Sequence, residues 1–109
     1  MKYIDLHVHS SFSDGTDTPG QIIKKCARLN LKLCSITDHD TISGQEESVY
    51  YAKKLGVPYI TGVEFSVRHD GEFHILGYGV DLIKTKKSGK ISREIKLFAE
   101  GEEIFSALL

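Results

Sequence analysis

Strand-like and helix-like patterns of apolar residues alternate along this chain, and the alternation limits its fold more than any other feature. Short apolar runs typical of strands occupy residues 2–8, 31–37, 59–67 and 73–80. Helical patterns fill the two intervals between the first three of these runs. Since strands that are joined through helices pair in parallel with right-handed crossovers, the order β-α-β-α-β-β predicts an α/β fold.

Residues at their ends mark the two helices. Thr18 is a good cap for the first helix and Gln21 completes a capping box, while Asn30 fits a left-handed stop. The second helix is expected over about residues 44–55, with Gly56 just beyond its end. The apolar face of the first helix is formed by Ile22, Ile23, Cys26, Ala27 and Leu29.

The end of this pattern divides the chain into two parts. Asp70-Gly71 is a hairpin signal that makes the last strand antiparallel to the third, with His69 exposed at the tip. Residues 1–81 form the α/β region. Residues 82–109 are expected to be a basic linker followed by a weakly helical tail.

Composition excludes several classes of protein. A net charge of −1 argues against a module that binds duplex nucleic acid. No apolar run approaches the roughly 20 residues that a bilayer needs, and no signal-peptide pattern opens the chain. We therefore expect a cytoplasmic protein without membrane contact. Cys26 and Cys34 are too few for a disulfide scaffold and too far apart for a CxxC motif, so buried thiols are expected.

Side chains that can bind a metal ion follow the ends of several predicted strands. His7 and His9 lie two residues apart at the end of the first strand, so both imidazoles point the same way. The other candidate histidines and the candidate acids are expected at the same edge of the sheet, near the carboxyl ends of the strands. This edge is where active sites of parallel α/β folds form. The candidate ligands are His7, His9, Asp14, His39, Glu64 and His74.

The types of donor narrow the chemistry. Imidazoles and carboxylates without thiolates suit Zn²⁺, Mn²⁺ or Fe²⁺, and the two oxygens of Glu64 suit a bridge between two ions. Two ions about 3.5–4 Å apart are the usual device for phosphoester hydrolysis. Two further acids flank His39. Asp38 fits an acceptor that orients this ring, and Asp40 fits equally well a cap for the turn before the second helix.

Four ordered motifs run through the first part of the chain. They are DLHVHSSFSDGTDTP at 5–19, ITDHDTISG at 36–44, TGVEFS at 61–66 and HILGYG at 74–79. Together they resemble the PHP (polymerase and histidinol phosphatase) family of metal-dependent phosphoesterases. The second motif, with Asp40 and Thr41 after His39, looks more like stand-alone bacterial members that hydrolyse nucleotides or the 5′ ends of short RNA than like polymerase domains.

The resemblance implies the N-terminal portion of a distorted (βα)₇ barrel with up to three Zn, Mn or Fe ions at the strand ends. The implied grouping is His7, His9 and Glu64 for one ion, Glu64 and His74 for a second, and Asp14 and His39 for a third. Glu64, His39 and Asp14 are thereby assigned to the catalytic centre. The implied substrate is a phosphorylated small molecule or a short nucleic acid, hydrolysed by a metal-activated water.

The chain departs from the family's pattern after His74. Later strands of family members supply a further histidine and an Asp-x-His, whereas here no histidine follows His74 and no aspartate follows Asp81. Two readings therefore stay open: a phosphoesterase fragment, or a truncated and inactive metal-binding half-barrel that another chain must complete. Half a barrel also leaves two sheet edges unpaired, which favours a homo-oligomer.

Overall fold

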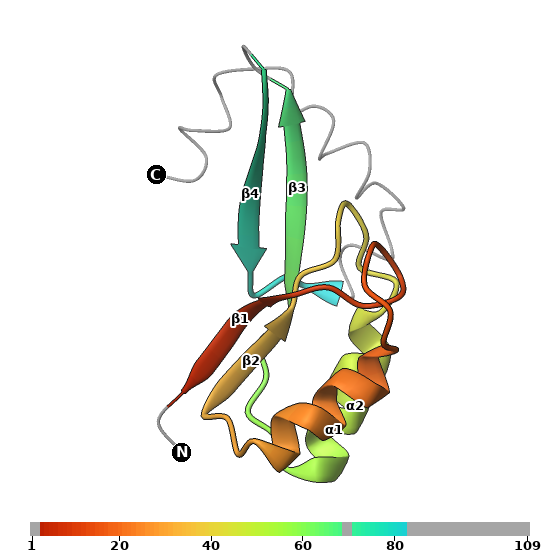
Figure 1. Ribbon diagram of the computed structural model, residues 1–109, viewed down its shortest axis with the longest axis vertical. Helices are drawn as coiled ribbons and strands as arrows, with labels where there is room; N and C mark the ends of the chain where they lie inside the picture. The colour runs from red at the N-terminus through yellow and green to blue at the C-terminus, as the bar shows by residue number, and fades with distance from the viewer. Residues whose placement is uncertain (1–2, 69–70, 83–109) are drawn as a thin grey trace.

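The computed structural model describes residues 3–68 and 71–82, where the elements follow the predicted order β-α-β-α-β-β (Figure 1). The elements are β1 (Ile4–Val8), α1 (Pro19–Arg28), β2 (Leu33–Ile36), α2 (Gln45–Leu55), β3 (Gly62–Arg68) and β4 (Glu72–Tyr78). Within these ranges no helix is long and apolar enough to cross a membrane. The predicted position of His69 and, from residue 83 onward, the predicted linker and tail lie outside the described residues.

Within the described ranges, the strands form two small sheets that meet between β2 and β3. β1 and β2 are parallel, and β3 and β4 form an antiparallel hairpin, as predicted. Between β2 and β3 the parallel pairing is reduced to two isolated bridges, Cys34 with Tyr59 and His39 with Glu64. In Figure 1, α1 and α2 lie side by side along one side of β1 and β2, and the β3–β4 hairpin extends away from them.

The ends of α1 lie where its local sequence predicts them. The Thr18 hydroxyl accepts a hydrogen bond from the Gln21 backbone N–H (3.2 Å), and the Thr18 N–H donates to the Gln21 side chain (2.8 Å). These two bonds complete the predicted capping box. Beyond the helix, Asn30 has the predicted left-handed conformation, with a φ of 55°.

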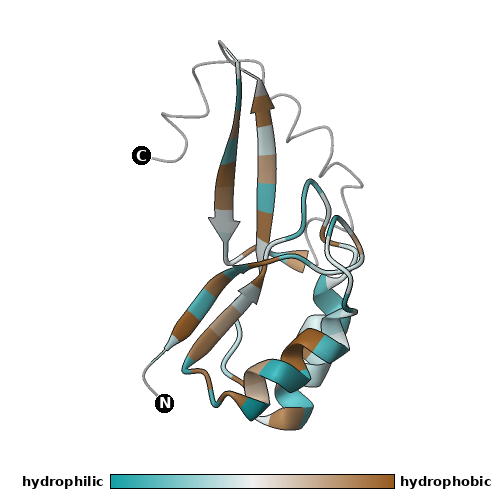
Figure 2. Ribbon diagram, in the orientation of Figure 1, coloured by the Kyte–Doolittle hydropathy of each residue, from teal (hydrophilic) through white to brown (hydrophobic). Residues whose placement is uncertain are grey.

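The core lies between the inner faces of the helices and β2. Its buried members are Ile22, Ile23, Cys26, Cys34, Ile36, Ala52 and Val57, and both cysteines are therefore buried as predicted. Leu29, expected on the same face, is 57% exposed, because α1 ends at Arg28 and Leu29 is its C-terminal cap. Figure 2 shows hydrophobic and hydrophilic bands alternating along β3, whose Val63 and Val67 are buried.

The amide of Gln45 takes the place of a peptide group between β2 and β3. Its Nε2 donates to the Ile36 carbonyl (2.7 Å), and its Oε1 accepts from the Gly62 N–H (3.3 Å) and the Tyr59 hydroxyl (2.7 Å). The Tyr59 hydroxyl in turn accepts from the Ile36 N–H (3.2 Å). Burial raises the pKa of Tyr59 to about 12, so its hydroxyl keeps its proton at neutral pH. The side chain of a helix thus satisfies strand backbone groups, which explains why β3 begins at Gly62 rather than at Tyr59.

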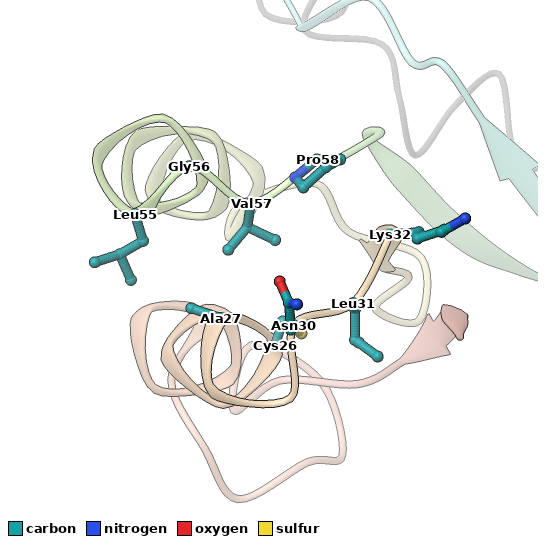
Figure 3. A pocket seen from close by; sticks show the side chains of 9 residues that line it. All are labelled: Cys26, Ala27, Asn30, Leu31, Lys32, Leu55, Gly56, Val57 and Pro58. Carbon is teal, nitrogen blue, oxygen red and sulfur yellow. The ribbon is translucent and has the colours of Figure 1, made fainter. Parts of the chain in front are cut away.

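A cavity of about 410 Å³ opens between the C-terminal ends of α1 and α2 (Figure 3). There Gly56 is the C-terminal cap of α2, with a left-handed φ of 68°. Lys32 and Pro58, on the cavity wall, precede β2 and β3. The cavity therefore lies beside the starts of these strands, whereas the predicted ligands lie around the carboxyl ends of β1 and β2 and on the β3–β4 hairpin.

Candidate functional site

The six predicted ligand residues come together where the carboxyl ends of β1 and β2 meet the β3–β4 hairpin. They are His7 in β1, His9 and Asp14 in the segment that follows it, His39 after β2, Glu64 in β3 and His74 in β4. The imidazole rings form a row. Neighbouring ring centroids are 5.2 Å apart for His7 and His9, 4.4 Å for His9 and His39, and 5.1 Å for His39 and His74.

Glu64 lies at the centre of this group and is its one buried member, with 4% of its surface exposed. Its Oε1 lies 2.6 Å from His7 Nε2 and 2.7 Å from His9 Nε2, and its Oε2 lies 2.5 Å from His74 Nδ1. Burial acts to raise the pKa of Glu64, but hydrogen bonds with the three histidines outweigh burial and lower it to about 2. Glu64 is therefore ionised at neutral pH, with one oxygen facing each side of the group.

His9 lies between two carboxylates. Its Nε2 faces Glu64, and its Nδ1 lies 2.6 Å from Oδ1 of Asp14, whose other oxygen is 3.2 Å from His39 Nε2. Burial acts to raise the pKa of Asp14, but the His9 hydrogen bond and the nearby histidine charges lower it overall. A neutral imidazole carries one N–H and can donate to one carboxylate at a time. A divalent cation between ring and carboxylate satisfies both groups without a proton, so the arrangement fits a metal ion.

His74 reaches Glu64 across the hairpin. The register pairs Glu64 with Leu76 and Ser66 with His74, so Glu64 and His74 are diagonal neighbours on one face. The hydrogen bond with Glu64 raises the pKa of His74, and Glu72, 3.6 Å from His74 Nε2, acts in the same direction. The structure thus brings His74 and Glu64 together, as the predicted hairpin requires.

The donor atoms fall into three triads, in each of which the atoms lie within 4.8 Å of one another. The triads are His7–His9–Glu64, His9–Asp14–His39 and His39–Glu64–His74. Each pair of triads shares one residue, so the three form a closed ring. The donors are imidazole nitrogens and carboxylate oxygens, a mixture that suits Zn²⁺, Mn²⁺ or Fe²⁺. The residues present therefore fit divalent cations.

Glu64 takes its position from the last parallel contact between the β2 segment and β3. The Asp40 N–H donates to the Glu64 carbonyl (2.9 Å), and the Glu64 N–H donates to the Asp38 carbonyl (3.0 Å). The sequence predicts Glu64 near the end of the third strand, but it is the third residue of β3. The difference arises because β3 starts late and then continues into the hairpin beyond the parallel contact.

The backbone next to His7 is irregular. The pairing of β1 with β2 shifts register between Asp5 and Val8, and such irregularities re-aim the side chains beside them. Within this stretch the Leu6 carbonyl accepts a 2.6 Å hydrogen bond from the Tyr78 hydroxyl, at the end of β4. Tyr78 therefore supports the segment from which His7 projects.

The two acids that flank His39 do not take the roles predicted for them. The carboxylate of Asp38 is fully buried and accepts hydrogen bonds from the β1–α1 loop instead of orienting the His39 ring. Asp40 has a left-handed φ of 51°, and its Oδ1 accepts from the Ser66 N–H in β3 (2.9 Å) instead of capping the turn before α2. Sequence reasoning also missed the supporting residues Ser10, Ser13, Gln45 and Tyr78.

Comparison with known proteins places the chain among relatives of similar sequence. A family model described as PHP domain matches residues 5–107. The chain is 36% identical over 113 residues to a 3′,5′-nucleoside bisphosphate phosphatase of Chromobacterium violaceum, covering 94% of this chain and 39% of the relative. It is 34% identical over 112 residues to a 5′-3′ exoribonuclease of Haemophilus influenzae, covering 97% and 41%. The chain thus spans about two fifths of the length of these curated relatives.

Solved structures share the α/β arrangement. An amidohydrolase from Chromobacterium violaceum with bound sulfate superposes with a TM-score of 0.75 and 36% identity, over 83% of this chain and 32% of the other. A protein from Bifidobacterium adolescentis, assigned as a metal-dependent phosphoesterase, gives a TM-score of 0.72 and 28% identity, over 89% and 33%. The family match extends from the first ligand motif to beyond the described hairpin. The chain therefore belongs to the PHP domain family.

Proposed function

We propose that this chain supplies part of the active site of a metal-dependent phosphoesterase that hydrolyses nucleotides or short oligonucleotides with a metal-activated water. The observation that carries the proposal is the position of Glu64, whose oxygens face His7 and His9 on one side and His74 on the other. The names of the relatives, a nucleoside bisphosphate phosphatase and an exoribonuclease, support a nucleotide or RNA substrate. In this proposal the six elements belong to the N-terminal part of a (βα)₇-type barrel.

The proposed ligands of Zn, Mn or Fe ions are His7, His9, Asp14, His39, Glu64 and His74. Such ions, when bound, lower the pKa of a water and neutralise charge on phosphoryl oxygens. Glu64 is ionised and faces both sides of the group, so it is suited to hold two ions at a fixed separation. Asp14 and His39 are suited to hold a third ion beside these two, because Oδ2 of Asp14 lies 3.2 Å from Nε2 of His39. Glu64, His39 and Asp14 therefore form the proposed catalytic centre.

The donors limit how many ions these residues hold by themselves. A neutral imidazole offers one lone pair, so His9 and His39 each serve one ion at a time although two triads share them. Glu64 differs, because it offers one oxygen to each side. One position from each of the four histidines, one from Asp14 and two from Glu64 make seven. Seven positions are enough to give each of two ions the three protein ligands that are typical of catalytic zinc. A third ion therefore needs further ligands.

Metal content of purified variants tests the bridging role. Glu64→Ala removes a donor from two triads, whereas His7→Ala and His74→Ala each remove a donor from one. We expect Glu64→Ala to lose the most Mn²⁺ in equilibrium dialysis. We also expect its hydrolysis of a nucleoside bisphosphate to fall by more than the roughly 10–100-fold typical of residues that only support a ligand. Glu72→Ala, which removes an acid of β4 outside the triads, is the matched control.

Retention of both metal content and rate by Glu64→Ala would show that the bridging role is wrong. Loss of hydrolysis in His7→Ala and His74→Ala with an unchanged Glu64→Ala rate would contradict it as well. Loss in Glu72→Ala equal to that in Glu64→Ala would point to a general effect of negative charge near the histidines.

A second candidate function is a metal-binding half-barrel that is inactive until another chain completes its site. One observation favours it: the seven donor positions of the described residues are too few for three ions. Size-exclusion chromatography with metal analysis separates the two functions. An inert monomer with fewer than two ions supports the half-barrel, and an active homo-oligomer supports completion through open sheet edges. An active monomer overturns the half-barrel.

A further inference from the structure

We propose that Asp38 is a positioning residue that holds together the triad of His9, Asp14 and His39. The inference rests on the proposed function, which makes this triad a metal position. Each member of the triad is the chain neighbour of one residue in a hydrogen-bonded cluster. The neighbours are Ser10, which follows His9, Ser13, which precedes Asp14, and Asp38, which precedes His39.

Three hydrogen bonds join Asp38 to the loop after β1. The Ser10 N–H donates to Oδ1 (2.6 Å), the Ser10 hydroxyl donates to Oδ2 (2.6 Å), and the Ser13 hydroxyl donates to Oδ1 (2.7 Å). Asp38 and Ser10 are both fully buried. Hydrogen bonds to a carboxylate are roughly twice as strong as neutral ones, and exclusion of water strengthens them further. The loop after β1 is thereby tied to the loop after β2 at one buried point.

Ser10 also organises the turn that carries Asp14. Its carbonyl accepts from the Gly15 N–H (2.9 Å), and its hydroxyl accepts from the Phe12 N–H (3.2 Å). The turn is so close to the end of β1 that a Cβ at Gly15 would lie 2.1 Å from the carbonyl oxygen of His9, the residue that follows this strand. Movement of Ser10 away from Asp38 is therefore transmitted to Asp14.

The remaining donors have a different support. His7, Glu64 and His74 project from strands that are held by backbone pairing. His39 is itself bridged to Glu64, so its backbone stays in place when the loop after β1 loosens. A change in the Asp38 cluster therefore weakens the triad that contains Asp14 and spares His39–Glu64–His74 more than a general loss of stability would.

The test alters one hydroxyl of the cluster in the full 109-residue chain. Ser13→Ala deletes one hydrogen bond to Asp38 without removing a metal donor, and Ser13→Thr keeps the hydroxyl. Ser11→Ala, the same substitution in an exposed neighbour outside the cluster, is the matched control. We expect Ser13→Ala to lower the affinity for one bound Mn²⁺ ion by roughly 10–100-fold in a metal titration. A loss of this size is typical when residues that orient metal ligands are removed. Ser13→Thr and Ser11→Ala should bind like the unmodified chain.

A measurement on metal-free protein separates this proposal from the proposed function. Long-range ¹H–¹⁵N spectra report the protonation of each histidine ring nitrogen, and loosening the Asp14 loop should alter the His9 signals and spare those of His74. If the unmodified chain binds no Mn²⁺ but Ser13→Ala still changes the NMR signals of His9, the proposed function is wrong and the positioning role of Asp38 is supported. Unchanged His9 signals and Mn²⁺ affinity in both Ser13→Ala and Asp38→Asn would overturn the positioning role. An equal loss of affinity for every bound Mn²⁺ ion, together with a lowered Tm, would show that the substitution weakens the whole fold and does not act selectively on the triad of His9, Asp14 and His39.

Discussion

The hydroxyl of Tyr78, at the end of β4, donates a 2.6 Å hydrogen bond to the carbonyl of Leu6 in β1. In the described part of the chain, β1 pairs with β2 and β4 pairs with β3, so this side chain links strands that belong to different sheets. Burial raises the pKa of Tyr78, which keeps the donor proton in place at neutral pH. The link fixes β1 beside His7, where the strand pairing is irregular.

Tyr78→Phe should therefore lower both stability and metal affinity. Loss of one hydrogen bond typically costs about 1 kcal/mol, and urea unfolding measures this change. Mn²⁺ bound through His7 should be weakened as well, because its strand segment loses a support. Tyr50→Phe is the control, since Tyr50 is 59% exposed and packs against Tyr51 in α2. Equal midpoints for the two variants would refute the role of the Tyr78 hydroxyl.

Gln45→Leu should destabilise the fold more than most single substitutions. Leucine has a similar size, but it leaves the Ile36 carbonyl and the Gly62 N–H without the partner that Gln45 provides. Buried polar groups without partners cost about 1–3 kcal/mol each, so we expect a loss of at least about 2 kcal/mol in urea unfolding. Lys53→Leu, at an exposed position of the same helix, controls for the added apolar side chain. A loss no larger than that of the control would mean that water replaces the amide.

Gly15→Ala should disrupt the loop that carries Asp14. A Cβ at this position would lie 2.1 Å from the His9 carbonyl oxygen and 2.6 Å from its carbon, and backbone atoms cannot swing away as a side chain can. We expect about 1–3 kcal/mol of destabilisation and loss of one bound ion, measured by thermal unfolding and metal analysis. Gly77→Ala, whose Cβ would meet the Phe65 ring at 3.1 Å, should be tolerated better. The reverse order of the two variants would contradict this reading of the loop.

Metal binding should release protons, and the number released should fall as the pH rises. The hydrogen bond with Glu64 raises the pKa of His74, so a protonated ring is favoured at lower pH. A metal ligand must be a neutral imidazole, so the ion displaces this proton below the pKa of His74 and displaces none above it. Calorimetric titration with Mn²⁺ in buffers of different ionisation enthalpy, at about pH 6 and about pH 8.5, measures the release. The same number of released protons at both pH values would show that the metal ion displaces no proton from His74.

Local signals predicted the helix ends well. Thr18 and Gln21 satisfy each other within one turn, and Gly56 needs no distant partner for its left-handed conformation. The start of β3 could not be predicted in the same way. Tyr59 and the residues after it have strand-like character, but the Gln45 amide from α2 replaces part of the ladder there. Spacing along the chain gives no signal for a side chain that acts as a peptide group.

The grouping of the site residues could be expected because parallel strands end at one rim and the hairpin brings His74 back to Glu64, and the structure places all six donors there. The roles of Asp38 and Asp40, the two acids that flank His39, could not be predicted from the sequence. The partners of Asp38 are 28 and 25 residues away at Ser10 and Ser13, and the Ser66 partner of Asp40 is 26 residues away. The sequence predicts local caps and ring contacts for such acids, because those are the partners that spacing reveals.

The sharing of residues within the ring of triads has a consequence for any titration of this chain. An ion that enters the His9–Asp14–His39 triad occupies an imidazole that a neighbouring triad also uses, and it adds positive charge beside the next position. Occupancy of the proposed positions is therefore anticooperative, since each ion weakens the binding of its neighbour. Metal content will rise in separate steps over a wide range of free-metal concentration. The number of ions found in a preparation will then record the metal supply to which the protein was exposed.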